Sequence, residues 1–346
     1  MQFCHLHTHT EYSLLDGEAS IKKLVARVKE LGMDSCAITD HGSMYGVVDF
    51  YREAKSQGIH PVIGCEVYMA PRSRFDKVHD IDNKTSHLIL LAENQKGYKN
   101  LIKLVSAGYI DGFYYKPRID FEMLKEHSEG IIALSACIAG EVPKYAEVLG
   151  KDNYFLEIQD HGLSEQKRII PDMLRLSEET GIGLVATNDI HYLKKEDAKY
   201  QDVLMCIQME KKVDDPDRMK FETEEFYIKS PEEMTSLFEY VPQAIENTEK
   251  IAKRCNVDFD FGTRHLPAYA VPDGKDAFEY LRELCQSGLE KRYSPVSDEL
   301  QKRLDYELGV IKSMGFVDYF LIVWDFIHFA KNNGVMVGPG RGSAAG

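Results

Sequence analysis

Short apolar runs rich in β-branched residues alternate with amphipathic stretches along roughly the first half of the chain. Continuous apolar runs bounded by polar or turn residues are typical of strands buried on both faces, as in a parallel sheet. We therefore expect strands at residues 2–9, 35–40, 60–69, 87–92, 130–136, 153–159 and 182–189.

The stretches between most of these runs have the apolar spacing of helices, and each ends at or near a glycine, as helix C-termini commonly do. Helices are expected at residues 21–32, 46–58, 98–109, 165–181 and 232–255, the last packing against the sheet rather than forming a site. Strands that alternate with helices predict an α/β fold with a mostly parallel sheet, open or closed into a barrel.

Side chains that bind metals gather where these strands run into loops. In α/β folds the chemistry collects at the C-terminal ends of the strands. The residues that end a predicted strand, lie late in it or follow it are His7, His9, Asp16, Asp40, His41, Glu66, Cys137, Asp189 and His191. His87 begins its run instead, so it fits this rule least well.

Two pairs of these residues have a spacing that suits chelation. His7 and His9, and likewise Asp189 and His191, are two positions apart, which in an extended segment places both side chains on one face. Imidazole, carboxylate and thiolate together suit zinc or another first-row metal, and the carboxylates leave room for manganese or iron. The sequence predicts a metal site without choosing the ion.

Composition and charge limit the classes of function. The chain of 346 residues carries a formal net charge of -14, which opposes non-specific attraction to DNA, so any such contact must be local. The 7 cysteines form no CxxC pair, and no signal segment precedes the first strand, which predicts a reduced, cytoplasmic protein. The apolar run at 319–330 falls short of the about 20 residues that a membrane span needs, so no membrane partner is expected.

Six motifs occur in a fixed order along the chain: HTHTEYSLLDG, TDHG, GCEVY, SHLILL, SAC and TNDIH. Together they resemble the polymerase and histidinol phosphatase (PHP) domain family, in the form found at the N-terminus of the bacterial DNA polymerase III α subunits. The tail MGFVDYFLIVWDFIHFAKNNGVMVGPGRGSAAG looks like the start of the palm domain of those replicative polymerases. This ordered set, joined to that tail, is far more specific than a lone HxH.

The resemblance implies a distorted seven-stranded (β/α) barrel of the PHP, TIM-like type. It would occupy residues 1–265 with its peripheral helices, followed by a truncated palm segment at 266–346. It also implies two or three divalent ions, zinc or manganese ahead of iron. By resemblance, His7, His9, Glu66 and Asp189 hold one ion, Glu66, His87 and Cys137 hold a second, and Asp16, His41 and His191 hold the third.

The chemistry implied by the resemblance is phosphoester hydrolysis at a metal cluster bridged by Glu66. Two ions about 4 Å apart lower the pKa of a bridging water and neutralise charge on the attacking and leaving oxygens. The fitting substrate on a DNA polymerase is the 3′ end of the primer, which predicts a 3′–5′ exonuclease of the proofreading type. Two alternatives stay open: a metal-stabilised scaffold or docking domain without catalysis, and a free-standing phosphatase, against which residues 270–346 count.

The glycine-rich tail at 338–346 carries the resemblance to the palm. By that resemblance, Gly342 and Ser343 meet the triphosphate of the incoming nucleotide, with Arg341 beside them. No acidic pair for the magnesium ions of polymerisation is recognisable, so this stretch alone is not expected to synthesise DNA. The implied full-length protein would use magnesium, a DNA primer-template and dNTPs, and would contact a sliding clamp, other replisome subunits and a separate proofreading subunit.

Other polar residues have plainer interpretations. Asp40 points away from His41 in a regular strand, which favours an indirect role behind the ligands. For His5, an indirect role behind the ligands and a packing role are equally favoured. For His161, substrate contact and a role in a turn both stay open. Loops are predicted at 72–75 and 114–120, and their basic residues are Arg72, Arg74, Lys116 and Arg118. These side chains could contact a DNA backbone or base, but we expect them to be solvated instead.

Overall fold

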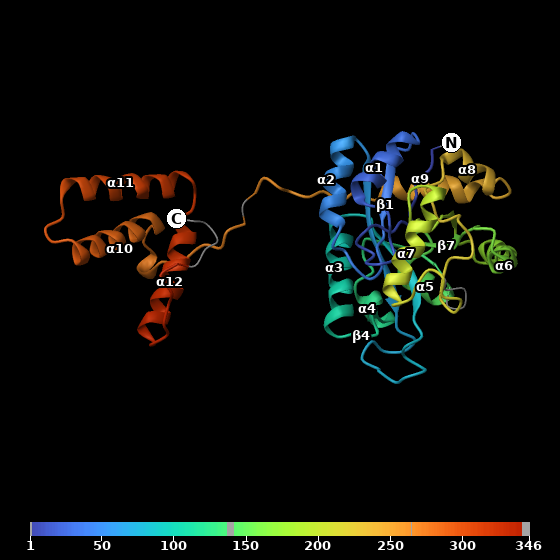
Figure 1. Ribbon diagram of the computed structural model, residues 1–346, viewed down its shortest axis with the longest axis horizontal. Coiled ribbons are helices and arrows are strands. Elements are labelled where there is room, and N and C mark those ends of the chain that lie inside the picture. Colours follow the sequence, from blue (N-terminus) through green and yellow to red (C-terminus); the bar gives the residue numbers. More distant parts are fainter. Residues whose placement is uncertain (1, 137–141, 264, 341–346) are drawn as a thin grey trace. The chain divides into compact units, whose positions relative to one another are not determined.

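A computed structural model of the chain describes residues 2–136, 142–263 and 265–340. The chain divides into two compact units, Met1–Asp258 and Phe259–Gly346 (Figure 1). The domain boundary predicted at 265/266 falls a few residues beyond this division.

The first unit contains all the strands that the structure describes. These are β1 (Ser35–Ile38), β2 (His60–Met69), β3 (Ser86–Ala92), β4 (Phe113–Tyr114), β5 (Lys116–Ile119), β6 (Ile131–Leu134), β7 (Tyr154–Ile158) and β8 (Leu184–Ala186). Its helices, which lie around the strands in Figure 1, are α1 (Ile21–Glu30), α2 (Val47–Gln57), α3 (Gln95–Ile110), α4 (Phe121–Glu126), α5 (Val142–Leu149), α6 (Ser164–Thr180), the short η1 (Lys195–Asp197), α7 (Ala198–Gln208), α8 (Pro231–Leu237) and α9 (Pro242–Arg254).

The sheet follows the order β1-β2-β3-β6-β7-β8, and the N-terminal segment joins its two ends. His5 bridges to Cys36 in β1, and Thr8 bridges to Ile190 beyond β8, both in parallel register. The backbone of His9 donates to the carbonyl of Ile190 at 2.8 Å. The N-terminal segment and these six strands therefore form a distorted barrel, which confirms the predicted α/β fold class.

The N-terminal segment lies where a strand was predicted at 2–9 but forms only single bridges. Side-chain hydroxyls take places that backbone carbonyls occupy in a regular ladder: the N–H of Thr8 donates to Oγ1 of Thr39 at 2.7 Å, and the N–H of Cys4 to Oγ1 of Thr248 at 3.2 Å. The segment is held on both sides without being a regular strand.

Strand β3 runs antiparallel to both of its neighbours, β2 and β6, whereas the pairs β1–β2, β6–β7 and β7–β8 are parallel. The start of β3 therefore lies at the same rim as the C-terminal ends of the other strands. His87, near that start, pairs directly with Tyr68 at the end of β2. Because β3 runs in the reverse direction, His87 lies at the rim of the candidate site although it begins its run.

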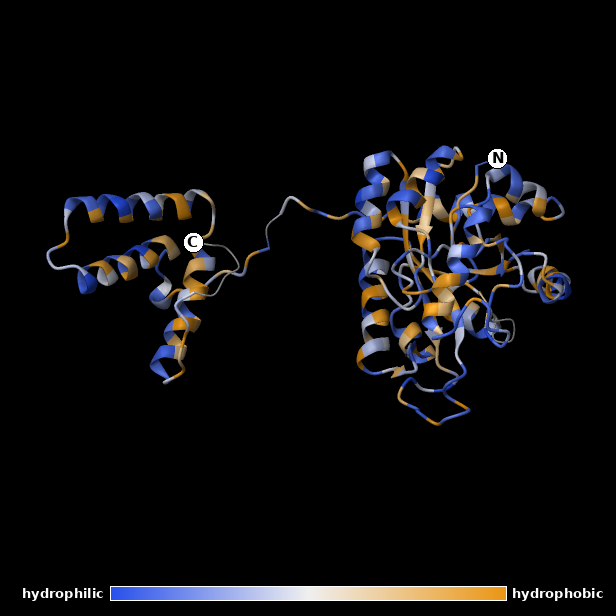
Figure 2. Cartoon of the chain, viewed as in Figure 1, coloured by the Kyte–Doolittle hydropathy of each residue, from blue (hydrophilic) through white to orange (hydrophobic). Residues whose placement is uncertain are grey.

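The apolar interior of the barrel explains why the strands read as continuous hydrophobic runs. Strand β2 is buried at every position after His60, so both of its faces are covered. The central cluster includes Leu6, Ala37, Val62, Ile89, Leu91, Ile132, Leu134 and Val185, with Ile251 and Ala252 of α9 packed on it. In Figure 2 these strands carry the hydrophobic colour, while the surrounding helices also show hydrophilic faces.

The helix predicted at 232–255 is two helices, α8 and α9, so the prediction of one continuous helix was wrong. Pro242 supplies no N–H for a hydrogen bond to the preceding turn, and it stands at the first position of α9, where prolines are tolerated. Helix α8 begins with a capping box between Ser230 and Glu233. Packing of α9 against the barrel agrees with the prediction.

The stretch 114–120 was predicted to be a solvated loop, but it contains most of an antiparallel hairpin formed by β4 and β5. Strand β5 also pairs in parallel with the end of β2. Arg118 in β5 is fully buried, and its guanidinium donates to the carbonyls of Gly112, Arg74, Asp76 and Asp82 at 2.7–3.0 Å. Arg118 therefore ties the 74–82 loop to the hairpin, and a role for it in DNA contact is excluded.

The two arginines of the 72–75 loop are also engaged within the protein. Arg72 makes a two-pronged contact with the carboxylate of Asp82, and Arg74 contacts that of Asp120 at 3.0 Å. Of the basic residues predicted to lie in solvated loops, Lys116 is exposed and forms no ion pair among the described residues.

The second unit is helical where it is described, with η2 (Pro272–Gly274), α10 (Ala277–Arg292), α11 (Asp298–Ser313) and α12 (Val317–Asn332). Its small core centres on Leu281, Leu308 and Leu321, one from each long helix. None of the helices among the described residues is both long and apolar enough to span a membrane. The predicted palm residues Arg341, Gly342 and Ser343 lie outside the described residues.

Candidate metal centre

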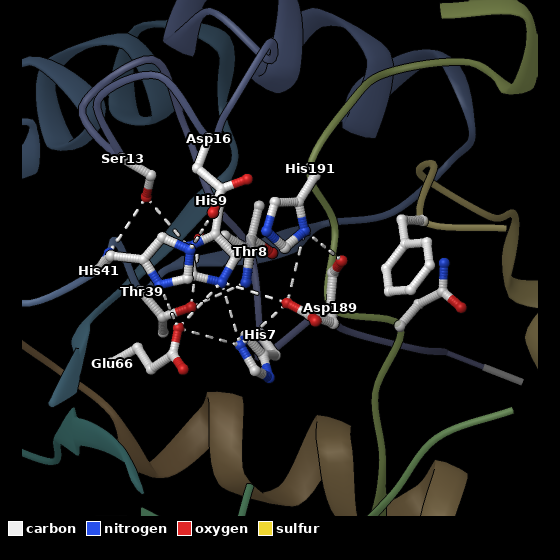
Figure 3. A network of polar contacts seen from close by, with 12 residues as sticks. His7, Thr8, His9, Ser13, Asp16, Thr39, His41, Glu66, Asp189 and His191 are labelled. Carbon is white, nitrogen blue, oxygen red and sulfur yellow. Dashed lines mark hydrogen bonds and ion pairs between the residues drawn. The ribbon is translucent and has the colours of Figure 1, made fainter. Parts of the chain in front are cut away.

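Five segments that are far apart in the sequence bring polar side chains to one rim of the barrel. Figure 3 shows His7 and His9 from the N-terminal segment facing Glu66 of β2 and Asp189 beyond β8, with His41 beside them. Asp16 and His191 complete the group, and His87 contacts Glu66 from β3. Of the predicted ligands, Cys137 alone lies outside the described residues.

Three atoms at the centre have the mutual spacing of ligands to one ion. His7 Nε2 and His9 Nε2 are 3.1 Å apart, and Oδ1 of Asp189 lies 3.1 and 3.2 Å from them. Two ligand atoms about 2.1 Å from a shared zinc ion would be separated by about 3.4 Å in tetrahedral geometry. Oε2 of Glu66 lies 3.2 Å from His9 Nε2 and 3.8 Å from His7 Nε2, so it suits a fourth ligand.

Glu66 presents its two oxygens to different neighbours. Oε2 lies 2.6 Å from Nδ1 of His41 and close to His9, whereas Oε1 lies 2.8 Å from Nδ1 of His87. A carboxylate with each oxygen facing a separate set of donors is arranged as a bridge between two ions. This geometry supports the predicted bridging role of Glu66.

A third group of donors lies beside the first. Nε2 of His41 is 3.4 Å from Oδ2 of Asp16, and the ring of His191 is 4.4 Å from the ring of His9 and 5.7 Å from that of His41, centroid to centroid. Donor nitrogens of His9, His41 and His191 lie within 4.8 Å of one another. Gln201 holds the other oxygen of Asp16 with a hydrogen bond of 3.0 Å.

Several atoms that face this centre are buried without a well-aligned hydrogen bond, although some of them lie close to one another. They are Oε2 of Glu66, Oδ1 of Asp189 and both ring nitrogens of His41. A buried polar atom without a partner costs about 1–3 kcal/mol, and such atoms are rare in folded proteins. Oε2 of Glu66 and Oδ1 of Asp189 each lie 3.2 Å from Nε2 of His9. Because this donor set is one that zinc and other first-row metals prefer, the residues fit a metal cluster.

The electrostatics of the cluster keep its two central carboxylates ionised. Although burial favours the neutral acid, the neighbouring histidines hold the pKa of Glu66 and of Asp189 well below the ordinary value. Burial together with the His41 and His191 rings lowers the pKa of His9 to about 3, so its ring is neutral at pH 7 with a lone pair available for coordination. Ionised carboxylates and a neutral imidazole are the protonation states that metals bind.

Glu157, a residue that we did not predict, orients His7. Its Oε1 accepts a hydrogen bond from Nδ1 of His7 at 2.8 Å, which leaves Nε2 of that ring with its lone pair toward Asp189. Oε2 of Glu157 accepts from the backbone of Ala136 at 3.0 Å. Carboxylates behind metal-binding histidines fix the tautomer in this way. The signal in the sequence was a lone carboxylate inside the apolar run YFLEI.

Ser13 and Asp40 do the same for His9. The hydroxyl of Ser13 accepts from Nδ1 of His9 at 3.0 Å and donates to Oδ1 of Asp40 at 2.7 Å. Asp40 also accepts from the backbone and hydroxyl of Thr10 at 2.6 and 2.9 Å. The Asp40 carboxylate therefore reaches the His9 ring through Ser13, in line with the indirect role predicted for Asp40.

The backbone at two positions has the left-handed conformation that brings ligands together. An extended segment was predicted for Asp189 and His191, but Asp189 has a φ of 42°. The backbone therefore turns between the two residues. Gly42, after His41, has φ +57, and a side chain there would meet Pro117 at 2.8 Å and the Tyr68 ring at 3.0 Å. Glycine is required at position 42 for both reasons.

His5 and His161 lie apart from the cluster. Nε2 of His5 donates to the carbonyl of Lys229 at 2.9 Å in a fully buried site. Of the two roles considered for His5, this contact favours packing. His161, also fully buried, donates from Nε2 to the carbonyl of Asn188 at 3.0 Å and stacks on Phe226. A buried ring with both of these contacts cannot reach a substrate.

Replacing Glu157 with glutamine is expected to weaken metal binding about 10- to 100-fold, the usual cost of losing such an orienting carboxylate. A glutamine cannot accept from His7, Gln159 and Ala136 together, because one of its ends only donates. The measurement is zinc or manganese affinity by competition with a chelator. An affinity equal to that of the parent chain would show that Glu157 serves packing alone.

Two protein-family models match the chain: the PHP domain over residues 5–161, and the bacterial DNA polymerase III alpha NTPase domain over residues 279–346. The chain is 48% identical to DNA polymerase III subunit alpha of Treponema pallidum over 363 aligned residues, covering 100% of this chain and 31% of that protein. The subunits from Borreliella burgdorferi and Helicobacter pylori are 47% and 44% identical, covering 100% and 99% of this chain and 32% of each relative. The chain thus spans about a third of the length of these relatives.

Proposed function

Since residues 5–161 match the PHP domain model, and the chain matches DNA polymerase III alpha subunits over its whole length, we propose that its barrel hydrolyses phosphodiesters at DNA 3′ ends. The proposed activity is a metal-dependent 3′–5′ exonuclease of the proofreading type. In the longer protein it would act on the primer strand.

The observation that carries this proposal is the position of Glu66 between two sets of donors. One of its oxygens faces His9 and His41, and the other faces His87. A shared carboxylate of this kind is what a cluster with adjacent ions requires, and paired ions are typical of enzymes that cleave phosphate esters. A scaffold with a single structural ion would not need it.

The proposed assignment of residues to ions is the one that the resemblance to the PHP domain family implies. His7, His9, Glu66 and Asp189 would hold the first ion, Glu66 and His87 the second together with Cys137, and Asp16, His41 and His191 the third. Zinc or manganese suits these donors best, with iron next. Bound there, the ions would activate water and neutralise charge on a phosphate.

The side chains of the chain itself supply orientation. Glu157 and Ser13 hold the His7 and His9 rings with Nε2 toward the centre, and Gln201 holds Asp16. These bonds fix the donors before substrate binds, so little reorganisation remains for the reaction. The site is open to solvent on the side of Asp16 and His41, whose side chains are each about a fifth exposed (23% and 21%).

A nuclease assay tests the proposal. The purified chain is incubated with manganese or zinc and a 5′-labelled primer-template, and shortening from the 3′ end is followed on a gel. We expect shortening by the parent chain and its loss in the His9→Ala variant, because His9 belongs to two donor groups. Absence of shortening with every metal tested would refute the exonuclease.

The alternatives give different results in the same experiment. A metal-stabilised scaffold predicts that His9→Ala lowers the thermal stability of the chain while the parent shows no nuclease activity. A free-standing phosphatase predicts turnover of histidinol phosphate without shortening of DNA. The match of residues 279–346 to a polymerase domain weighs against the phosphatase.

We further propose that the longer protein synthesises DNA in the cytoplasm with magnesium, a primer-template and dNTPs. Arg341, Gly342 and Ser343 are the proposed contacts of the incoming nucleotide. The sliding clamp and other replisome subunits, a separate proofreading subunit among them, are its proposed partners.

A further inference from the structure

A cavity of about 180 Å³ opens directly beside the candidate metal centre. Asp16 and His41 form part of its wall, so whatever fills the cavity lies next to the third group of donors. Pockets for drug-sized ligands run from about 300 to 1,000 Å³. The cavity is therefore sized for one small planar group rather than for a duplex.

Tyrosines form much of the lining of this cavity. Tyr45, Tyr68 and Tyr109 line it, coming from the loop before α2, from β2 and from α3. Tyr68 is buried, but Tyr45 and Tyr109 are 62% and 39% exposed. The Tyr109 ring lies 6.3 Å from the Tyr45 ring and 6.3 Å from the Phe113 ring, centroid to centroid. Exposed aromatic rings beside a polar centre can serve as a surface on which bases stack.

Lys116 adds a cation to the same cavity. Its ammonium lies 5.2 Å from the centre of the Tyr68 ring, and it forms no ion pair in the part of the chain that the structure describes. The other basic residues considered for DNA contact, Arg72, Arg74 and Arg118, are bound to carboxylates or carbonyls of the protein. In a chain of net charge -14, this places a local positive charge beside the metal centre.

We propose that this cavity binds the last nucleotide of a single-stranded DNA 3′ end, with its base on Tyr109 and Tyr45 and a phosphate on Lys116. The subsite rests on the proposed exonuclease function and specifies its substrate: a frayed, unpaired end rather than a paired one. Stacking on tyrosine does not distinguish one base from another, which is what removal of any mismatched nucleotide requires.

The proposal is tested by binding without turnover. A 5′-labelled single-stranded oligonucleotide with phosphorothioate linkages at its 3′ end, which resist hydrolysis, is titrated with the metal-loaded chain and followed by fluorescence anisotropy. A second oligonucleotide differs only in lacking the 3′-terminal base. We expect the parent chain to bind the abasic form about tenfold more weakly, since each stacked base contributes measurably to affinity.

In the Tyr109→Ala variant, binding of the intact oligonucleotide should fall about tenfold, and the difference between the intact and abasic forms should disappear. Tyr109→Phe should behave as the parent, which shows that loss in the alanine variant comes from the ring and not from misfolding. Lys116→Gln should weaken both forms equally and reduce the dependence of binding on salt. Tyr240→Ala and Lys167→Gln, exposed residues that do not line the cavity, are the matched controls.

A parent chain that binds both oligonucleotides equally, or a Tyr109→Ala variant that keeps the difference between them, would overturn the proposal. These outcomes are separate from failure of the exonuclease. Hydrolysis of ordinary DNA with no preference for the terminal base would refute the subsite alone, whereas the preference without hydrolysis would refute the exonuclease alone.

Discussion

Replacing Glu66 with glutamine is expected to remove more metal and more activity than any other single change in the chain. Each Glu66 oxygen faces a different set of histidines, so the amide would present a donor where one of the two sets needs an acceptor. Since loss of an indirect orienting carboxylate costs about 10- to 100-fold, loss of a shared ligand should lower the rate of hydrolysis at least about 100-fold.

The measurement combines metal content per chain with the rate of 3′-end shortening. Asp16→Asn is the matched control, because Asp16 contacts His41 and not the group around His7 and Asp189. It should lose at most one ion per chain, whereas Glu66→Gln should lose at least two. Equal metal content in the Glu66→Gln variant and the parent would exclude the bridging role.

Replacing Arg118 with methionine should lower the free energy of unfolding by about 3 kcal/mol or more. The guanidinium is fully buried and donates to four backbone carbonyls, and each buried acceptor left without a partner costs about 1–3 kcal/mol. The loss would be measured by urea denaturation of the full chain.

Two controls separate this effect from a loss of charge. Arg175→Met removes an arginine whose side chain is 68% exposed and whose ion pairs on α6 are at the surface, so a change within about 1 kcal/mol is expected. Arg118→Lys keeps the charge but cannot reach four carbonyls, so it should restore only part of the stability. If Arg118→Met unfolds at the same urea concentration as Arg175→Met, the buried hydrogen bonds contribute little.

Most of the barrel could be predicted because its strands are buried on both faces. The residues of β2 and β3 form apolar runs without alternation, and the predicted 60–69 and 87–92 agree with His60–Met69 and Ser86–Ala92. The direction of β3 could not be read, since a buried strand has the same composition whether it runs parallel or antiparallel. That direction is what brings His87 to Glu66.

The errors have physical causes. Lys116, Pro117 and Arg118 look like a solvated loop because a buried arginine is rare, and the four carbonyls that bind this one come from two separate segments. Pro242, which marks the break between α8 and α9, is visible in the sequence. The spacing of apolar residues alone does not detect such a break, because the same spacing continues on both sides of the proline.

Which residues would form the site could be predicted, but not all of the residues that support it. Most of the candidate ligands stand at strand ends in motifs of imidazole and carboxylate, so their types and positions were visible together. Glu157 and Gln201 act on other side chains rather than on an ion, and their roles depend on contacts between segments that are more than a hundred residues apart in the sequence. Spacing along the chain carries no record of such contacts.

Elemental analysis of the chain as purified, and after incubation with zinc or manganese, tests the central claim most directly. If side chains from the N-terminal segment, β2, β3 and the segment beyond β8 share a metal cluster, the chain should hold two or three divalent ions. Fewer than one ion per chain after incubation with both metals would contradict the cluster, and with it the hydrolysis of phosphodiesters proposed for this rim of the barrel.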